Sequence, residues 1–298
     1  MPVSLLLCLS LLAALIASIA RKSYTNRNRA GALGVFSFNF ATHLVITVIF
    51  LLWGGFRLPS LFTLWLGLAF GLITSLQGVA FLAALGCGPM SYTTVIVSFS
   101  TLISALSGAL FFDERLSFLQ GVGILLMLCS FILAAKKETS GAKTSKKWLI
   151  LCFVAFLLTG AIGVLQKIHQ SSPFKEEANE FLILAFLFSS CFSLVLSLWT
   201  YAKKKSPRQE RHARGAWRHL LFIVSLCAAD AAGAAVNNKL NLSLSGVIDS
   251  AVFFPIVNGG SLLLSMLAAL LLFKERPTRR QWLGIAAGVL AVLLLCIP

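Results

Sequence analysis

The sequence has 298 residues, of which 58% are hydrophobic and only 12% are charged, and its mean hydropathy is +0.90. A soluble domain carries roughly 25% charged residues, so this composition excludes an ordinary soluble protein and indicates an integral membrane protein. Seven cysteines are dispersed singly without a CxxC pair, which favours neither a disulfide framework nor a zinc site. We therefore expect an all-α membrane protein with no metal site and no cofactor.

Apolar runs interrupted by charged residues, proline or glycine predict ten transmembrane helices, each near the length of about 20 residues that spans a bilayer. The first run begins without a basic segment, so we interpret it as a span rather than as a removable signal peptide. The predicted helices cover residues 2–20, 30–53, 61–85, 92–112, 118–135, 148–170, 180–202, 219–242, 247–273 and 281–297.

The net charge of +15 arises from 25 basic and 10 acidic residues, and its distribution is uneven. The first, third, fifth, seventh and ninth connections hold 20 of the 25 basic residues, and the other connections hold 5. Because basic residues stay on the cytoplasmic side, this pattern predicts a plasma-membrane protein with both termini extracytoplasmic. The charge then serves orientation and contact with the lipid bilayer, and it requires no nucleic-acid partner.

One segment occurs twice at an offset of 161 residues. Phe112-Asp113-Glu114-Arg115, followed by Gln120 and Gly123, recurs as Phe273-Lys274-Glu275-Arg276, followed by Gln281 and Gly284. This repeat predicts a five-helix unit in residues 1–137, a basic cytoplasmic linker in 138–147 and a second five-helix unit in 148–298. Because five is odd, the second unit enters the membrane from the opposite side, which makes the two units inverted repeats. We expect packing roles for the motif, with the two glutamines bonding across a tight helix pair.

With these motifs, the chain resembles the drug/metabolite transporter superfamily and, within it, the EamA-like ten-helix permeases. The resembling residues are the glutamate that closes a helix (Glu114 or Glu275), the short loop, and the glutamine that opens the next helix (Gln120 or Gln281). The resemblance covers essentially the whole chain. It implies a secondary transporter that moves a small metabolite, such as an amino acid, an amine or a drug-like compound. Ten-helix members usually have both termini in the cytoplasm, whereas the charge distribution of this chain places them outside.

Polar side chains inside the spans are the candidates for substrate binding or coupling, because such groups are costly in lipid unless they face protein or water. Asp230 lies about eleven residues into the eighth predicted helix among small residues, and Asn238 follows on the same face. Gln77 in the third helix corresponds to Asn238 at the offset of 161. Asn258 follows Pro255 by three residues, and this proline frees a backbone carbonyl.

Asn39 and His43 form a further candidate pair, spaced i, i+4 on the second helix. Asp230 could bind the positive end of an amine-bearing substrate, or exchange a proton with His43 as the relay. The proton is thus a candidate coupling ion. The alternative for Asp230, and for the Asn39–His43 pair, is a structural bond to a neighbouring helix.

The sequence bears on three classes of function. An enzyme is not expected, because the sequence contains neither HExxH nor GxSxG. Repeated halves with polar residues in mid-membrane favour a secondary transporter acting by alternating access on a small-molecule substrate, as a monomer or a homodimer. The alternative is a non-transporting membrane scaffold or a lipid flippase subunit. Without a GxxxxGK[ST] motif, uphill transport would use an ion gradient or exchange.

Overall fold

The computed structural model describes residues 2–28, 32–87, 93, 96–112, 117–134, 146–203, 216–272 and 279–295. Within these ranges the chain is helical, with short connections between the helices and no strand. The helices are α1 (Val3–Asn28), α2 (Ala32–Gly54), α3 (Leu61–Cys87), α5 (Ser100–Phe111), α6 (Phe118–Ala134), α7 (Lys146–Gln170), the short 3-10 helix η1 (Lys175–Glu177), α8 (Ala178–Lys203), α9 (Ala216–Ser245), α10 (Ser250–Leu272) and α11 (Arg279–Leu295).

Six helical segments of the described chain are long and apolar enough to cross a membrane, and they lie in α1, α2, α3, α7, η1–α8 and α9. Shorter apolar segments lie in α5, α6 and α10. A helix satisfies its backbone hydrogen bonds internally, so helices suit a chain this poor in polar groups. All-helical membrane architecture is thus confirmed.

Ser117 and Gln120 fix the start of α6 through a reciprocal pair of hydrogen bonds. The backbone N–H of Gln120 donates to Ser117 Oγ (3.2 Å), and the N–H of Ser117 donates to Gln120 Oε1 (3.1 Å). This is a capping box, which satisfies two amides that a helix start leaves without partners. The expectation that Gln120 bonds across a helix pair was therefore wrong, because its side chain is used by its own helix.

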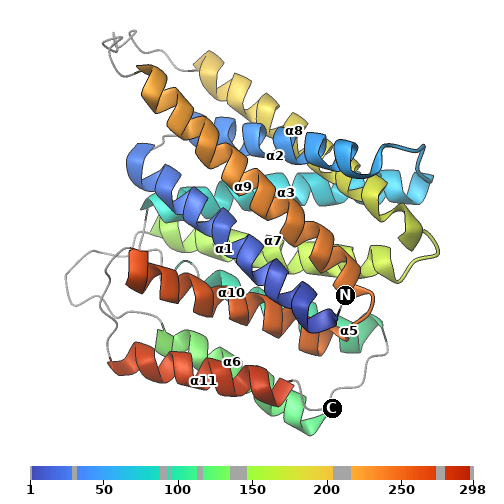
Figure 1. The fold of residues 1–298 in the computed structure, drawn as a ribbon, viewed down its shortest axis with the longest axis vertical. Helices are drawn as coiled ribbons and strands as arrows, with labels where there is room; N and C mark the ends of the chain where they lie inside the picture. Colours follow the sequence, from blue (N-terminus) through green and yellow to red (C-terminus); the bar gives the residue numbers. More distant parts are fainter. Residues whose placement is uncertain are drawn as a thin grey trace.

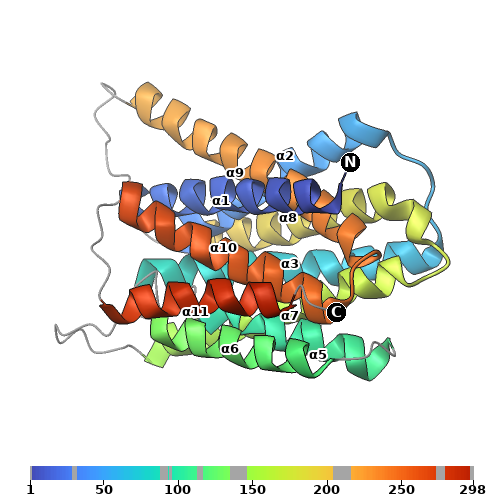
Figure 2. The ribbon, with the colours of Figure 1, turned by 60° about the horizontal axis from the view of Figure 1, so that its bottom comes forward.

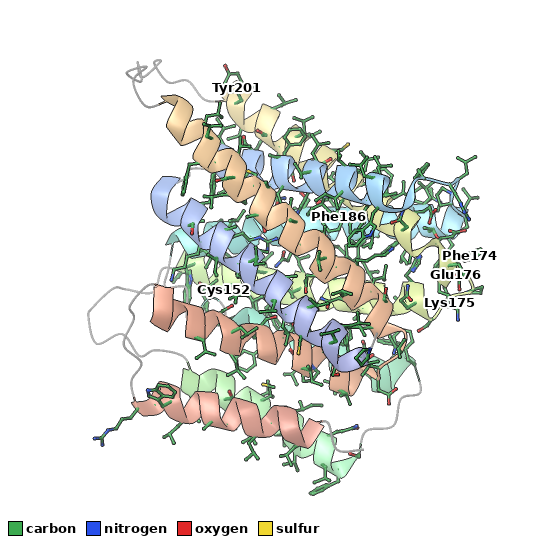
Figure 3. All side chains as sticks on the ribbon, viewed as in Figure 1. Cys152, Phe174, Lys175, Glu176, Phe186 and Tyr201 are labelled. Atoms are coloured by element: carbon green, nitrogen blue, oxygen red, sulfur yellow. The ribbon has the colours of Figure 1, made fainter. Side chains whose placement is uncertain are left out.

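The helices form a bundle in which α2 and α8 pack together at one edge and α6 and α11 at the opposite edge (Figure 1). The helices α1, α9, α3 and α7 lie between these edges, with α1 packed on α9 and α3 packed on α7 and α8. The helix α1 begins and the helix α11 ends at the same end of the bundle (Figure 2). The connection containing Phe174, Lys175 and Glu176 lies at this end, whereas Tyr201 lies at the other (Figure 3).

Parts of the repeated motif lie outside the described residues. These parts are residues 113–115 of the first copy and 273–276 of the second copy, which include Glu114 and Glu275, and the side chain of Gln281 is also not described. Most of the predicted linker, residues 138–145, is outside them as well. Gly123 and Gly284 are both buried, and Gly284 O accepts a hydrogen bond of 2.6 Å from Ser130 Oγ. This contact joins α6 to α11, as expected for glycines that let two helices approach closely.

Candidate functional site

A cavity of about 160 Å³ lies between α5, α7, α9 and α10. Carboxamide side chains contribute much of its polar lining: Gln166 from α7, Asn237, Asn238 and Asn241 from α9, and Asn258 from α10. Hydroxyl groups come from Ser104, Thr159 and Ser261. Because the polar groups come from four helices, the cavity exists only when the bundle is assembled.

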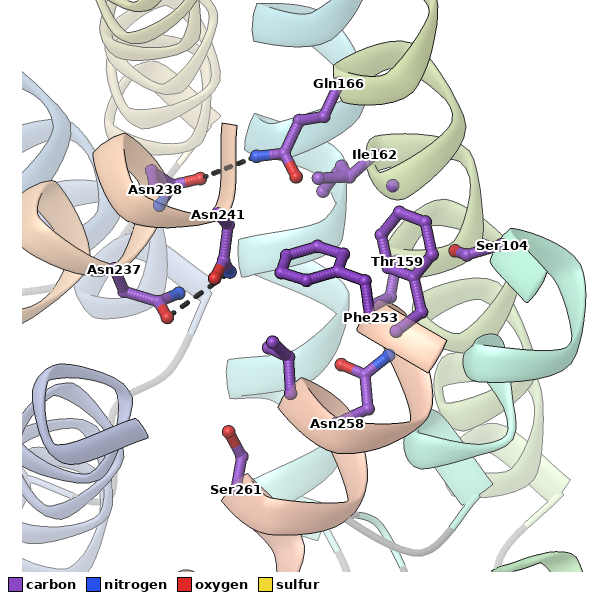
Figure 4. Close-up of a pocket in the computed structure, with 13 residues that line it drawn as sticks. Ser104, Thr159, Ile162, Gln166, Asn237, Asn238, Asn241, Phe253, Asn258 and Ser261 are labelled. Atoms are coloured by element: carbon purple, nitrogen blue, oxygen red, sulfur yellow. Dashed lines mark hydrogen bonds between the residues drawn. The ribbon is translucent and has the colours of Figure 1, made fainter. Parts of the chain in front are cut away.

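Hydrogen bonds hold most of the amides in place, as Figure 4 shows. Gln166 Nε2 donates to Asn238 Oδ1 (3.4 Å), which joins α7 to α9. Asn241 Nδ2 donates to Asn237 Oδ1 (3.3 Å), and Ser10 Oγ on α1 lies 2.9 Å from the same oxygen. Asn258 makes no hydrogen bond within the described part of the chain. Its amide therefore keeps its full donor and acceptor capacity.

The other wall of the cavity is apolar and consists of Ile162, Phe253, Phe254 and Val257. Figure 4 shows the ring of Phe253 opposite the α9 amides, with Asn258 and Ser261 on the next turns of α10. These residues flank Pro255, which lies inside α10. A small polar solute could thus bond to one wall and rest its apolar surface on the other.

Three of the predicted site residues belong to this cavity or its border. Asn238 and Asn258 line it directly. Gln77 on α3 reaches it indirectly, because Gln77 Nε2 donates to Oγ1 of the lining residue Thr159 (3.1 Å). The remaining three predicted residues do not line it.

Asn39 and His43 lie in a buried seam between α2, α3 and α8. Asn39 Nδ2 donates to Ser193 Oγ (2.8 Å) and to the backbone oxygen of Ser75 (3.4 Å). His43 Nδ1 lies 2.6 Å from Ser189 Oγ, and its ring meets the ring of Phe186 edge-on. Asn39 Nδ2 and His43 Nδ1 thus both have protein partners in this seam.

Asp230 lies at the middle of α9 and forms an ion pair with Arg21 of α1. Arg21 Nε is 2.9 Å from Asp230 Oδ1, and the two side chains are 24% and 2% exposed, respectively. The carboxylate therefore already has a cation within the chain. An exogenous amine would have to compete with Arg21 for it.

Three of the five carboxamide residues that line the cavity were not predicted as site residues: Gln166, Asn237 and Asn241. Gln166 lies beside Lys167 near the end of a predicted span, and polar residues are common at such positions. Asn237 and Asn241 are spaced i, i+4 on the face of α9 that meets α1 and the cavity. That spacing was the signal available in the sequence.

Together, the apolar helices and the partly open polar cavity define a polytopic membrane protein with room for a small solute. Residues 146–297 match the family model described as the EamA-like transporter family. The chain belongs to this family and is a membrane transporter of the drug/metabolite type. The matched segment coincides with the second of the two units predicted from the repeat.

A solved structure titled "Crystal structure of protein" has a similar fold, with a TM-score of 0.69 and 15% sequence identity. The alignment covers 99% of this chain and 96% of that chain. At this identity the similarity concerns the fold. A comparison with curated proteins gives no significant match.

Proposed function

We propose that the protein is a secondary transporter that carries a small, hydrogen-bonding metabolite across the plasma membrane by alternating access, with the amide-lined cavity as its substrate site. The observation that carries this proposal is the cavity itself. Polar side chains within a membrane are costly unless they face protein or water. The Asn258 amide has no hydrogen-bond partner in the described chain. Its position inside the membrane is explained if a bound solute supplies that partner.

The size of the cavity favours a small metabolite over a drug-like compound. Pockets that enclose drug-sized ligands measure about 300–1,000 Å³. The volume here is about 160 Å³. A molecule of a few to about a dozen heavy atoms suits such a space.

The packing of the described helices supports an inverted repeat. In chain order, the counterparts would be α1 and α7, α2 and α8, α3 and α9, α5 and α10, and α6 and α11. The pairs α2–α8, α5–α10 and α6–α11 pack against each other, each joining a helix to its own counterpart. The α1–α9 contact is matched by α3–α7, and the α5–α7 contact by α1–α10. A two-fold axis that relates the two halves would pair each helix contact in this way with the contact between the counterpart helices.

The location of the cavity along the helices indicates which side of the membrane it lies nearer in this conformation. Gln166 and Asn241 each lie four residues before the end of their helix, and Phe253 lies three residues after the start of α10. These helix ends lie at the end of the bundle where α1 begins and α11 ends. If the basic connections are cytoplasmic, as proposed from their charge, the cavity lies nearer the extracytoplasmic side.

Contacts nearer the other end of the bundle would then help to close the cytoplasmic path. They include the Arg21–Asp230 ion pair, the Asn39–Ser193 bond and a contact of 3.0 Å between Ser37 Oγ and Ser197 Oγ. Alternating access would require these contacts to open as the cavity closes at its outer end. We propose that Asp230 acts in this way, as part of a gate that can couple opening to a change in charge.

Uptake by reconstituted vesicles tests the proposal. Vesicles containing the protein are exposed to a mixture of small polar metabolites, with and without a pH gradient, and the internal solutes are identified by mass spectrometry. We expect at least one solute to accumulate, and Ser261→Trp to prevent this by filling the cavity. Val195→Trp is the matched control, because Val195 is 64% exposed on the outer face of α8.

Both tryptophan variants must elute and unfold like the wild type for the comparison to count. If wild-type vesicles move no solute under either condition, the proposal fails and a scaffold or flippase subunit becomes the better interpretation. Equal uptake by Ser261→Trp and Val195→Trp would instead exclude this cavity as the path.

A further inference from the structure

We infer that the cavity selects an uncharged solute with several hydroxyl or amide groups and one apolar face, and that it excludes amines, carboxylates and zwitterionic amino acids. This inference rests on the proposed transport function and names the class of its substrate. It excludes the amino acids and amines that were named among the predicted substrates. It stands on the chemistry of the lining residues.

None of the 13 residues that line the cavity carries an ionisable side chain. A charged group that leaves water for such a site loses its hydration without gaining a counter-ion. Neutral donors and acceptors replace the hydration of a hydroxyl or an amide far better than that of an ion. The lining therefore favours neutral polar solutes.

Charged residues close in sequence to the lining residues are absent from the described lining, and these include Lys239, which lies between Asn238 and Asn241 on α9. Asp230, the acidic residue of α9, is held by Arg21 and is itself 1% exposed. Lys167 follows Gln166 on α7, but its Nζ lies over the ring of Phe112, 5.9 Å from the ring centroid. Neither residue lines the cavity. Among the described residues, a substrate amine or carboxylate would thus meet no charged side chain in the lining.

The lining amides retain hydrogen-bonding capacity for a neutral solute. Asn258 has no partner in the described chain. Asn238 uses one N–H for the backbone oxygen of Ala234 (2.9 Å) and its oxygen for Gln166, which leaves a second N–H available. Gln166 Oε1 likewise accepts no hydrogen bond from the described residues. Donors and acceptors are both present, as recognition of hydroxyl and amide groups requires.

The apolar wall adds a constraint on shape. Phe253 and Phe254 meet edge-on with ring centroids 5.0 Å apart, and the ring of Phe253 lies opposite the amides of α9 (Figure 4). A ring compound with polar groups along one edge would satisfy both walls. Neutral monosaccharides and neutral aromatic amides are representatives of this class.

The test uses matched solutes that differ in charge. Reconstituted vesicles receive an equimolar mixture in which neutral sugars, polyols and aromatic amides are each accompanied by an amine and a carboxylate of the same skeleton. Glucose with glucosamine and glucuronate, and nicotinamide with 3-picolylamine and nicotinate, are two such sets. We expect a neutral member to accumulate at least about tenfold above its charged analogues. This ratio corresponds to the free-energy cost of leaving one polar group without a hydrogen-bond partner.

Accumulation of a charged member above its neutral analogue would overturn the inference and leave the transport function intact. If no solute of any charge is moved, the transport function fails, and this inference fails with it. The two failures are therefore distinguishable in one experiment.

An isosteric charge substitution provides a second readout. Asn258→Asp removes no hydrogen bond within the described chain and introduces a carboxylate into the cavity, so at pH 8 it should shift accumulation towards the amine by about tenfold or more. Ser243→Asp adds the same charge on α9 at an exposed position outside the lining and should leave selection unchanged. Unaltered selection in Asn258→Asp would count against the inference.

Discussion

Arg21 and Asp230 join α1 to α9 through an ion pair of 2.9 Å between Nε and Oδ1, at the middle of a helix that is otherwise rich in alanine. Arg21 lies among the residues that the sequence assigns to a cytoplasmic connection. In the structure α1 continues to Asn28, so Arg21 stays helical and its side chain reaches the carboxylate. This pair changes the expected role of Asp230 from a free acceptor for substrate amines to one member of an internal contact.

Breaking this ion pair from one side should destabilise the protein. Asp230→Asn leaves the Arg21 guanidinium without its counter-charge, and we expect a loss of about 3 kcal/mol in the free energy of unfolding, the lower end of the range for buried pairs because Arg21 is partly exposed. The midpoint of unfolding in detergent measures this loss. The double variant Arg21→Met/Asp230→Met should recover most of the stability, since no buried charge remains. A stable single variant combined with an unstable double variant would contradict this role.

Asn258 and Asn39 should respond in opposite ways to replacement by leucine. Asn258→Leu removes no bond within the described chain, so stability should be kept or increased while uptake falls at least about tenfold, because the substrate loses its partner. Asn39→Leu removes the bonds to Ser193 and Ser75 and should lower the free energy of unfolding by about 1–3 kcal/mol. Unfolding midpoints and uptake are measured on the same preparations. A large loss of stability in Asn258→Leu would argue for a structural role.

Two glycines of α3 offer a matched test of helix packing. A Cβ atom added at Gly71 would lie 2.5 Å from the backbone oxygen of Ala185 and 2.8 Å from Phe188 Cβ, so Gly71→Ala should cost about 1–3 kcal/mol by forcing α3 away from α8. At Gly86 an added Cβ meets nothing within 4 Å. Gly86→Ala should therefore be neutral or stabilising by up to about 1 kcal/mol through helix propensity. Comparable effects of the two substitutions on the unfolding midpoint would contradict the close α3–α8 contact.

The orientation proposed from the basic connections has its own test. A cysteine introduced between residues 203 and 218 should react with an impermeant thiol reagent only from the cytoplasmic side, and a reporter fused after Pro298 should behave as extracytoplasmic. Whole cells and inverted vesicles provide the two sides. Labelling on intact cells would favour the orientation that the family usually adopts.

The helices could largely be predicted from the sequence because hydropathy alone determines which segments enter a membrane. The ends of the helices were harder to predict from the sequence. The first helix was expected to stop at residue 20 because Arg21 and Lys22 are charged, yet Tyr24 on the same helix stacks on Phe38 of α2, with ring centroids 4.1 Å apart. Contacts of this kind extend α1 and cannot be read from local composition.

The candidate site was only partly predictable for a related reason. Asn39 and Asn258 look alike in the sequence, since each is a single amide in an apolar helix. The difference between them is the presence of Ser193 opposite one amide and of an open cavity beside the other. Partners that lie on different helices are decided by tertiary packing, so the sequence identifies polar residues in the spans without grouping them.

Accessibility of the cavity from both sides of the membrane is the central claim, and a cysteine at Ser261 measures it most directly. Ser261→Cys is a small change at a lining position, and the seven native cysteines are first replaced by alanine or serine. A small impermeant thiol reagent is applied to right-side-out and to inside-out vesicles that retain uptake. Alternating access predicts labelling of this cysteine from both sides, with slower labelling when the transported solute is present. Labelling from one side alone, or from neither, would contradict alternating access through this cavity.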